Sequence, residues 1–338
     1  MHLLYAALAV TLLALLGASA ASVPGGTTLI AIIVPYVALL TLLLGVCYRI
    51  ARWAASPVPF RIPTTCGQQR SLPWIRTAPL DNPGSGAGAV GRVALEVLVF
   101  RSLLRNSRTR IHNGRYATAE SRVLWLGAMA FHWSLLVVVL RHLRLVVEPV
   151  PAFVKWLGSV DGMLQIGAPT LLLTDLVLLA SIGYLLLRRW WDPLLRYLSL
   201  FSDYFALLLL LAIAVTGVLM RHVTRVDVVS LKQFALGLVA FHPALPVGSN
   251  PVFLAHLLLV SALAIYIPFS KLMHFGGALL SPTRNLANNS RRKRHVNPWN
   301  QPVPTHTYAE WEHEFADKLK LAGLPLDKAN DVGHTAAD

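Results

Sequence analysis

Four histidines lie inside long apolar stretches of the sequence: His132, His142, His256 and His274. Ionisable side chains are costly in an apolar environment, so those that occur there are candidates for a function. Imidazole can bind haem iron or carry protons. A single such histidine can equally be a packing residue that hydrogen-bonds to a neighbouring helix. The spacing of the four therefore has to decide between these interpretations.

The spacing of the histidines fits two opposed helices. His256 and His274 are 18 residues apart, so on a regular helix both project from one face, about 27 Å apart. His132 and His142 are 10 residues apart, which is about 15 Å along a helix, and their directions differ by roughly 80°. On antiparallel helices His132 can face His274 while His142 faces His256, provided that the helices tilt to absorb the unequal spacings. Two facing imidazoles with a flat macrocycle between them hold six-coordinate haem iron, so the pattern predicts two haem b groups at different depths.

Basic residues near the histidines are candidates for holding haem propionates, which need cationic or hydrogen-bonding partners where solvation is poor. The candidates are Arg141, Arg144, Arg221 and Lys271. The first two flank His142, the third ends the fifth apolar stretch at the same level, and the fourth precedes His274 by three residues. Long basic side chains also extend out of the membrane to lipid headgroups, which is the alternative interpretation.

The composition indicates a membrane protein. Of 338 residues, 55% are apolar and 14% are charged, and the mean hydropathy is +0.56, which leaves too little polar surface to cover a water-soluble globule. The net charge of +14 lies mainly in loops and tail, where arginines meet lipid headgroups, so no nucleic-acid partner is expected. The two cysteines, Cys47 and Cys66, form no CxxC or CxxCH motif. The chain alone is therefore not expected to hold an iron-sulfur cluster or covalently attached haem.

Six apolar stretches are long enough to cross a bilayer, which needs about 20 helical residues. They are approximately residues 3–22, 28–50, 122–147, 166–187, 204–221 and 251–275. The expected fold is an all-α membrane bundle of about six transmembrane helices. The first stretch ends like a signal peptide, but no Lys or Arg precedes its apolar part, so a retained helix is expected.

Basic residues are concentrated on one side of these six alternating helices. They occupy the loop 51–121, the segment that follows residue 187 and the tail at 291–294. The positive-inside rule makes that side cytoplasmic, which places the C-terminus in the cytoplasm and the chain in the cell (inner) membrane. The expected domain organisation is then an extra helix at 1–24, a membrane domain at 28–280 that contains the loop, and a polar tail at 281–338.

Two further helices are expected outside the membrane spans. Residues 90–112 in the loop combine an apolar run with regularly spaced arginines, which predicts an amphipathic interfacial helix. The sequence from Tyr308 to Ala322 predicts a short helix in the tail. The tail is expected either to dock a partner or to be disordered.

The histidine pattern resembles a known family. A pair ten residues apart precedes a pair eighteen apart, the latter in His256-Leu-Leu-Leu-Val and Tyr266-Ile-Pro-Phe-Ser-Lys-Leu-Met-His274-Phe. This pattern is similar to the dihaem cytochrome b (gamma) subunit of respiratory nitrate reductase, over residues 28–280 and five helices. The basic segment Phe100-Arg-Ser-Leu-Leu-Arg-Asn-Ser-Arg-Thr-Arg resembles more closely the cytochrome b subunit of the sulfite-reduction-associated Dsr membrane complex. That subunit is itself similar to the cytochrome b of heterodisulfide reductase.

The resemblance implies an electron-transfer subunit of an oxidoreductase complex. It carries over the ligand pairs His132 with His274 and His142 with His256, two haem b groups, and quinone chemistry beside the second pair. It also implies a cytoplasmic-side iron-sulfur partner of the heterodisulfide-reductase type, other complex subunits, and a role in sulfur metabolism.

Quinone chemistry moves protons with electrons, so a titratable group is expected near the ring. The candidates for this quinone site are His222 and its neighbour Arg221 at the end of the fifth stretch, and Asp175 in the fourth stretch. His222 can also be a solvated interfacial histidine. Asp175 can also make a packing hydrogen bond with Thr174 or another neighbour.

Two other functions remain open at the level of sequence. A proton-coupled membrane transporter would use the histidines as relays, but it predicts inverted repeats and helices broken at corresponding places. Neither is evident, although Pro268 is positioned to kink the sixth stretch. A haem-free membrane anchor for a soluble complex is the other alternative.

Overall fold

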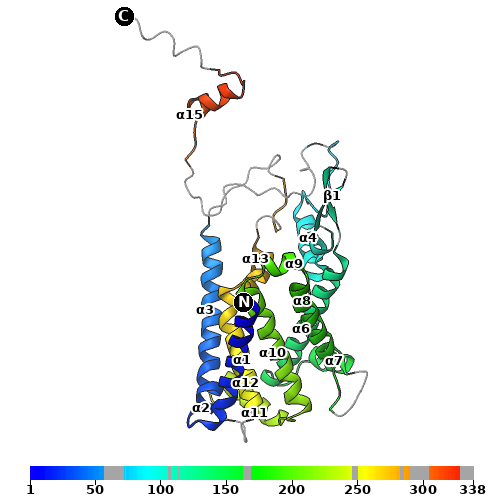
Figure 1. The fold of residues 1–338 in the computed structure, drawn as a ribbon, viewed down its shortest axis with the longest axis vertical. Helices are drawn as coiled ribbons and strands as arrows, with labels where there is room; N and C mark the ends of the chain where they lie inside the picture. Colours follow the sequence, from blue (N-terminus) through cyan, green and yellow to red (C-terminus); the bar gives the residue numbers. More distant parts are fainter. Residues whose placement is uncertain are drawn as a thin grey trace, which may run out of the picture.

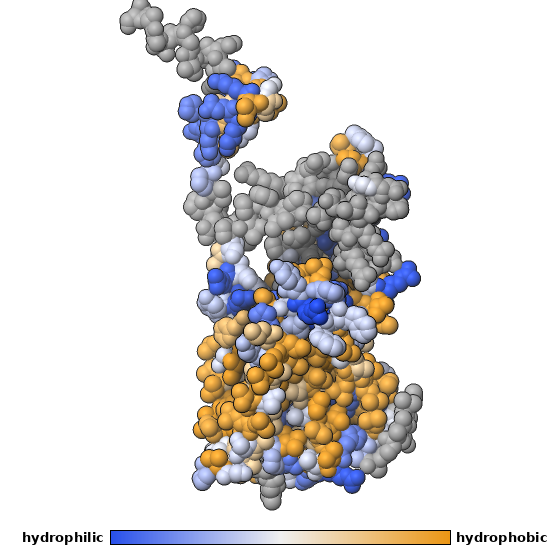
Figure 2. All heavy atoms as spheres, viewed as in Figure 1, coloured by the Kyte–Doolittle hydropathy of each residue, from blue (hydrophilic) through white to orange (hydrophobic). Residues whose placement is uncertain are grey.

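The protein is described here by a computed structural model in which residues 1–56, 72, 74–105, 108–112, 114–119, 121–162, 169–245, 250–281, 285–289 and 304–327 are placed. Within these residues, five helical segments are long and apolar enough to cross a membrane: His2–Ser22, Gly26–Ala54, Arg122–Val146, Phe201–His222 and Pro251–Phe269. Figure 2 shows the result as a broad apolar band with polar residues at both ends. The expected all-α membrane bundle is confirmed.

The spanning helices run side by side along the long axis of the molecule (Figure 1). They are α1 (His2–Ser19), α3 (Val34–Ala54), α6 (Arg122–Val146), α10 (Phe201–His222) and α12 (Pro251–Tyr266). A 3₁₀ turn at Ala20–Ser22 extends α1, and the short helix α2 (Gly26–Thr28) with a π-helical turn at Leu29–Ile33 leads into α3.

The predicted fourth span, 166–187, corresponds to α8 (Leu173–Trp191), and residues 163–168 lie outside the described part of the chain. This helix is long enough to cross a membrane but carries Asp175, Arg188 and Arg189, so it is less apolar than the other five. It packs closely against α6 and α10. Asp175 pairs with Arg141 of α6, and Arg189 donates to the Ser199 hydroxyl at 2.9 Å. Such protein partners are how membrane helices tolerate charged residues.

The predicted sixth helix, 251–275, is not continuous. The helix α12 ends at Tyr266, two 3₁₀ turns follow at Ile267–Phe269 and Lys271–Met273, and α13 (His274–Leu280) begins at the histidine itself. Pro268 is fully buried and cannot donate the hydrogen bond that would continue the helix. Ser270 is extended, with φ −119° and ψ 177°, and its hydroxyl accepts from the backbone N–H of Leu272. The straight 27 Å separation assumed from the sequence is therefore wrong.

The helices form two packed sets that meet at α10. One set consists of α12 with α1, α3 and α10, and the other consists of α6 with α8 and α11 (Val228–Val239). The contact between α1 and α12 is close: a Cβ atom at Gly17 would lie 2.7 Å from the Cα of Ala255. Val10 of α1 is buried with Leu209 and Leu259. The first helix is thus part of the core of the bundle.

The short elements are divided between the two ends of the bundle (Figure 1). One end has α7 (Ala152–Asp161) and α11, and the other has α4 (Gly86–Val99), α9 (Pro193–Leu198) and α13. The segments predicted to share one side thus lie at one end. Which compartment that end faces stays a prediction. The basic run at 291–294 and Cys66 lie outside the described residues.

The prediction of one amphipathic helix over residues 90–112 is wrong for the second half of that range. The helix α4 ends at Phe100, which adopts the left-handed conformation at φ 48°. A short helix α5 (Arg101–Arg105) follows, and β1 (Arg108–His112) then pairs with β2 (Arg115–Ala119) as an antiparallel hairpin. The tail helix is confirmed as α15 (Tyr308–Leu321), with a capping box between Thr307 and Glu310.

Candidate functional site

His132 and His274 face each other, as the spacing predicted. Their ring centres are 6.0 Å apart and the ring planes differ by 85°. Two imidazoles on opposite sides of one metal, each bound at about 2 Å, have ring centres about 6 Å apart. His132 lies within α6, and the break after Tyr266 places His274 at the start of α13. The break thus accommodates the unequal spacings that a straight helix would not.

His142 and His256 form the second predicted pair. They lie close enough for their rings to repel each other electrostatically when both are charged. His256 projects from α12 and His142 from the last turns of α6, so this pair lies nearer the α7 and α11 end. Each pair combines an exposed histidine, His142 or His274, with a partly buried one, His256 or His132.

All four histidines hold their Nδ1 atoms in hydrogen bonds. The Nδ1–H of His132 donates to the Ala128 carbonyl at 2.8 Å, that of His142 to Val138 at 2.7 Å, and that of His274 to Lys271 at 3.1 Å. A carbonyl oxygen can only accept, so each of these Nδ1 atoms carries the proton. Each Nε2 then keeps its lone pair, which is the tautomer that metal-binding imidazoles use.

The fourth Nδ1 has a side-chain partner that the sequence did not reveal. The Nδ1 of His256 lies 2.9 Å from the Thr216 hydroxyl of α10. That hydroxyl donates to the Ala212 carbonyl at 2.7 Å, so its oxygen accepts the proton of Nδ1. Nothing in the sequence near Thr216 marks it, because the contact joins helices 40 residues apart.

Aromatic rings enclose His132. Phe100 and Phe131 pack edge-on against it, with ring centres 4.9 and 4.8 Å away. Two tryptophan indoles of α6 fix the end of α4 that carries Phe100: Trp125 Nε1 donates to the Val99 carbonyl at 2.6 Å and Trp133 Nε1 to Leu98 at 3.1 Å. These carbonyls belong to the last turn of α4 and have no partner within the helix. The loop segment is therefore attached to α6 on both sides of His132.

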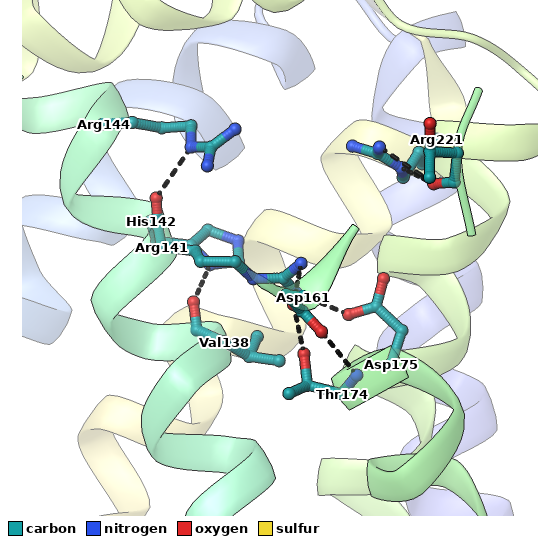
Figure 3. Close-up of polar contacts among 9 residues, drawn as sticks. Val138, Arg141, His142, Arg144, Asp161, Thr174, Asp175 and Arg221 are labelled. Atoms are coloured by element: carbon teal, nitrogen blue, oxygen red, sulfur yellow. Dashed lines mark hydrogen bonds and ion pairs between the residues drawn. The ribbon is translucent and has the colours of Figure 1, made fainter. Parts of the chain in front are cut away.

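A buried ion cluster lies beside His142. The side chain of Arg141 is 8% exposed and forms ion pairs of 2.6 Å with both Asp161 and Asp175 (Figure 3). The carboxylate of Asp161 also accepts from the backbone N–H and the hydroxyl of Thr174, at 2.8 and 2.6 Å. The cluster joins the end of α7 to α6 and to the start of α8.

This cluster excludes the headgroup interpretation of Arg141 and gives Asp175 a neighbouring partner other than Thr174. Arg141 does not extend to headgroups, since its guanidinium is enclosed between two carboxylates. Asp175 pairs with Arg141, and Thr174 binds Asp161 instead. Asp161 was missed because a single acid in a loop between spans looks like a solvated residue.

The other predicted cations have separate partners. Lys271, 69% exposed, pairs with Asp203 at 2.8 Å. Arg221 donates to the Thr170 carbonyl through Nε and Nη2, at 3.3 and 3.0 Å. Arg144 donates from Nε to the Arg141 carbonyl at 3.2 Å.

The predicted quinone-site residues are not joined to one another. His222 ends α10, and its Nε2 is buried without a hydrogen-bond partner among the described residues. Within the same residues, no hydrogen bond or ion pair links His222 to Asp175. Nor does that part of the chain contain a group of three or more His, Cys, Asp or Glu side chains arranged for a metal ion.

Comparison with known proteins places the chain in a family. Residues 89–290 match the nitrate reductase gamma subunit family. The chain belongs to that family. It is also 43% identical, over 275 residues, to a protein of Archaeoglobus fulgidus named "Hdr-like menaquinol oxidoreductase cytochrome b-like subunit", covering 79% of this chain and 82% of the relative. A protein of the same name from Archaeoglobus profundus is 43% identical over 272 residues, with 78% and 81% covered.

The family match includes all four histidines. It begins within α4 and extends past α13, so it covers both sides of each histidine pair. The helices α1 and α3 precede the matched region, although the resemblance was expected to begin at residue 28.

Proposed function

We propose that this chain is the membrane cytochrome b subunit of an oxidoreductase complex and transfers electrons between a quinone in the bilayer and a partner iron-sulfur subunit. The observation that carries this proposal is the 6.0 Å approach of the His132 and His274 rings, with the Nδ1 of each bonded to a carbonyl. The family membership and the menaquinol oxidoreductase names of the two relatives support it.

The four histidines are proposed as the axial ligands of two haem b groups. When bound, each haem supplies a one-electron redox centre. His132 and His274 hold one haem near the α4 and α13 end of the bundle, and His142 and His256 hold the other near the α7 and α11 end. The hydrogen bonds to Nδ1 orient each ring and make Nε2 a stronger ligand.

His222 is the proposed proton-handling residue for the quinone. Its buried Nε2 has no hydrogen-bond partner among the described residues, so it can exchange a hydrogen bond with a ligand. Asp175 is less suited to this role, because Arg141 already holds its carboxylate. A menaquinol is the quinone species that the relatives' names suggest.

The iron-sulfur partner is proposed to bind at the α4 and α13 end, on the cytoplasmic side. The sequence has two cysteines and no cluster motif, so the clusters have to come from another subunit. The attachment of α4 beside His132 supports this choice of end. A heterodisulfide-reductase-type partner, and a role in sulfur metabolism as in the Dsr branch, are the finer proposals.

Absorption spectroscopy of the full-length protein tests the proposal. Protein purified with haem available should show a reduced-minus-oxidised haem b spectrum at about two extractable haems per chain. His132→Ala and His274→Ala should each remove one and the same haem, and His142→Ala and His256→Ala the other. His242→Ala, at an exposed position, is the matched control and should keep both.

Either of two results would overturn the assignment. A haem-free full-length protein would favour the transporter or the anchor. Loss of different haems by two members of one pair would show that the pairing is wrong.

A further inference from the structure

The α7 and α11 end of the bundle has more basic than acidic residues. This end comprises the chain from the end of α6 to the start of α12, without the halves of α8 and α10 that lie toward the other end of the bundle. Its acidic residues are Glu148, Asp161, Asp175 and Asp227. The basic residues are Arg141, Arg144, Lys155, Arg221, Arg225 and Lys232. The undescribed stretches 163–168 and 246–249 contain no charged residue. The basic residues of this end therefore outnumber its acidic residues by two.

Every acid at this end already has partners. Asp161 and Asp175 both pair with Arg141. Glu148 pairs with Lys232. Asp227 accepts from the start of α11, including the Ser230 backbone at 3.2 Å and hydroxyl at 2.6 Å.

Of the six basic side chains, Arg141 and Lys232 pair with these acids. The other four have no carboxylate partner among the described residues, and two of them are solvated. Lys155 and Arg225 are exposed. Arg144 and Arg221 are partly buried, and among the described residues their hydrogen-bond partners are the carbonyls of Arg141 and Thr170. A guanidinium has five N–H donors, so most donors of both remain for a ligand.

The two guanidinium groups lie at the same end of the bundle. Arg144 is in the last turn of α6 and Arg221 in the last turn of α10, and Figure 3 shows both on the same side of the Arg141 cluster. Gly158 of α7 leaves room for the first: a Cβ there would lie 2.8 Å from Nη2 of Arg144. Two like charges held together in a poorly solvated region favour an anion between them.

We propose that Arg144 and Arg221 bind a dianion, the two propionates of the haem held by His142 and His256. This inference rests on the proposed function and names the residues that hold the propionates of one of its two haem groups. Of the four basic residues that the sequence offered, the structure pairs Arg141 and Lys271 with carboxylates, which leaves these two. Two propionates match two guanidinium groups whose hydrogen-bond partners among the described residues are carbonyls, and the position of Arg144 beside His142 matches the second haem. A lipid headgroup with two phosphates has the same chemistry and is the competing ligand.

Reconstitution with modified haem separates these ligands. Full-length protein stripped of haem is titrated with protohaem or with its dimethyl ester, in which both carboxylates are blocked. Binding is followed by the absorbance band that His142→Ala removes. In the unsubstituted protein the ester should bind that site about 10- to 100-fold more weakly, as expected for hydrogen bonds to charged groups. Arg144→Gln and Arg221→Gln should each reduce this preference, and the double variant should abolish it.

Arg225→Gln is the matched control, since it removes an exposed arginine from the same end. It should leave the preference for free carboxylates unchanged. Equal binding of haem and ester to the unsubstituted protein would overturn this inference while leaving the proposed function intact. If neither compound binds, both the inference and the proposed function are overturned.

Native mass spectrometry tests the lipid alternative. Protein purified with a diphosphate phospholipid is compared with the double variant. Loss of the bound lipid, together with no preference between haem and ester, would assign the arginines to the lipid and overturn the propionate assignment. The proposal expects the same lipid occupancy in both proteins.

Discussion

The buried cluster around Arg141 allows a quantitative prediction. The side chain of Arg141 is 8% exposed, and those of Asp161 and Asp175 are 3% and 15% exposed. Arg141→Met keeps an apolar stem of similar length and leaves two buried carboxylates without a cation. Breaking a buried ion pair from one side lowers the free energy of unfolding by about 3–5 kcal/mol. Lys232→Met is the control: its pair with Glu148 is 28% and 57% exposed, so about 0–1 kcal/mol is expected.

Unfolding in mixed micelles, titrated with a denaturing detergent, measures this difference. Hydrogen exchange should also rise in α7, because Asp161 anchors the end of that helix. A variant in which Arg141→Met is combined with Asp161→Asn and Asp175→Asn contains no unpaired charge. It should recover much of the lost stability. The reasoning would be refuted if Arg141→Met lowered the free energy of unfolding no more than Lys232→Met does. It would also be refuted if the triple variant were no more stable than Arg141→Met alone.

Two further substitutions test packing around the helices. Phe100→Gly keeps a backbone that glycine adopts readily at φ 48° but removes the ring from His132, so the spectrum of the haem proposed there should shift, whereas Phe100→Tyr should not shift it. Equal spectra for both variants would show that the ring is irrelevant. Gly17→Val should lower the free energy of unfolding by about 1–3 kcal/mol through its clash with Ala255. Gly183→Ala, in open space on α8, should not lower it by the same titration, because alanine favours a helix over glycine; equal losses would contradict the clash.

The spans and the histidine pairing could be predicted because both follow from regular geometry. Apolar length identifies a spanning helix, and helix direction with residue spacing decides which imidazoles face each other. The approach of His132 to His274 was reached in this way. The sixth helix was wrongly predicted to continue to residue 275, because Pro268 was treated as a kink, whereas α12 ends just before it.

The remaining features depend on contacts between distant segments. Thr216 and Asp161 act through partners 40 and 13 residues away, and no local pattern marks them. Phe100 ends α4 in a left-handed conformation that propensity would assign to glycine or asparagine. Its contacts with α6 outweigh that preference, and they became visible only once the two helices were placed together.

The packing of α1 has a consequence for how the chain assembles during synthesis. Its buried Val10 finds its neighbours in Leu209 of α10 and Leu259 of α12. At typical translation rates these partners follow about 10–50 seconds later. Until then Val10 and Gly17 of α1 lack the neighbours that they have in the folded bundle, Leu209, Leu259 and Ala255. Packing of α1 is thus a late event, because it has to wait until α10 and α12 have been synthesised.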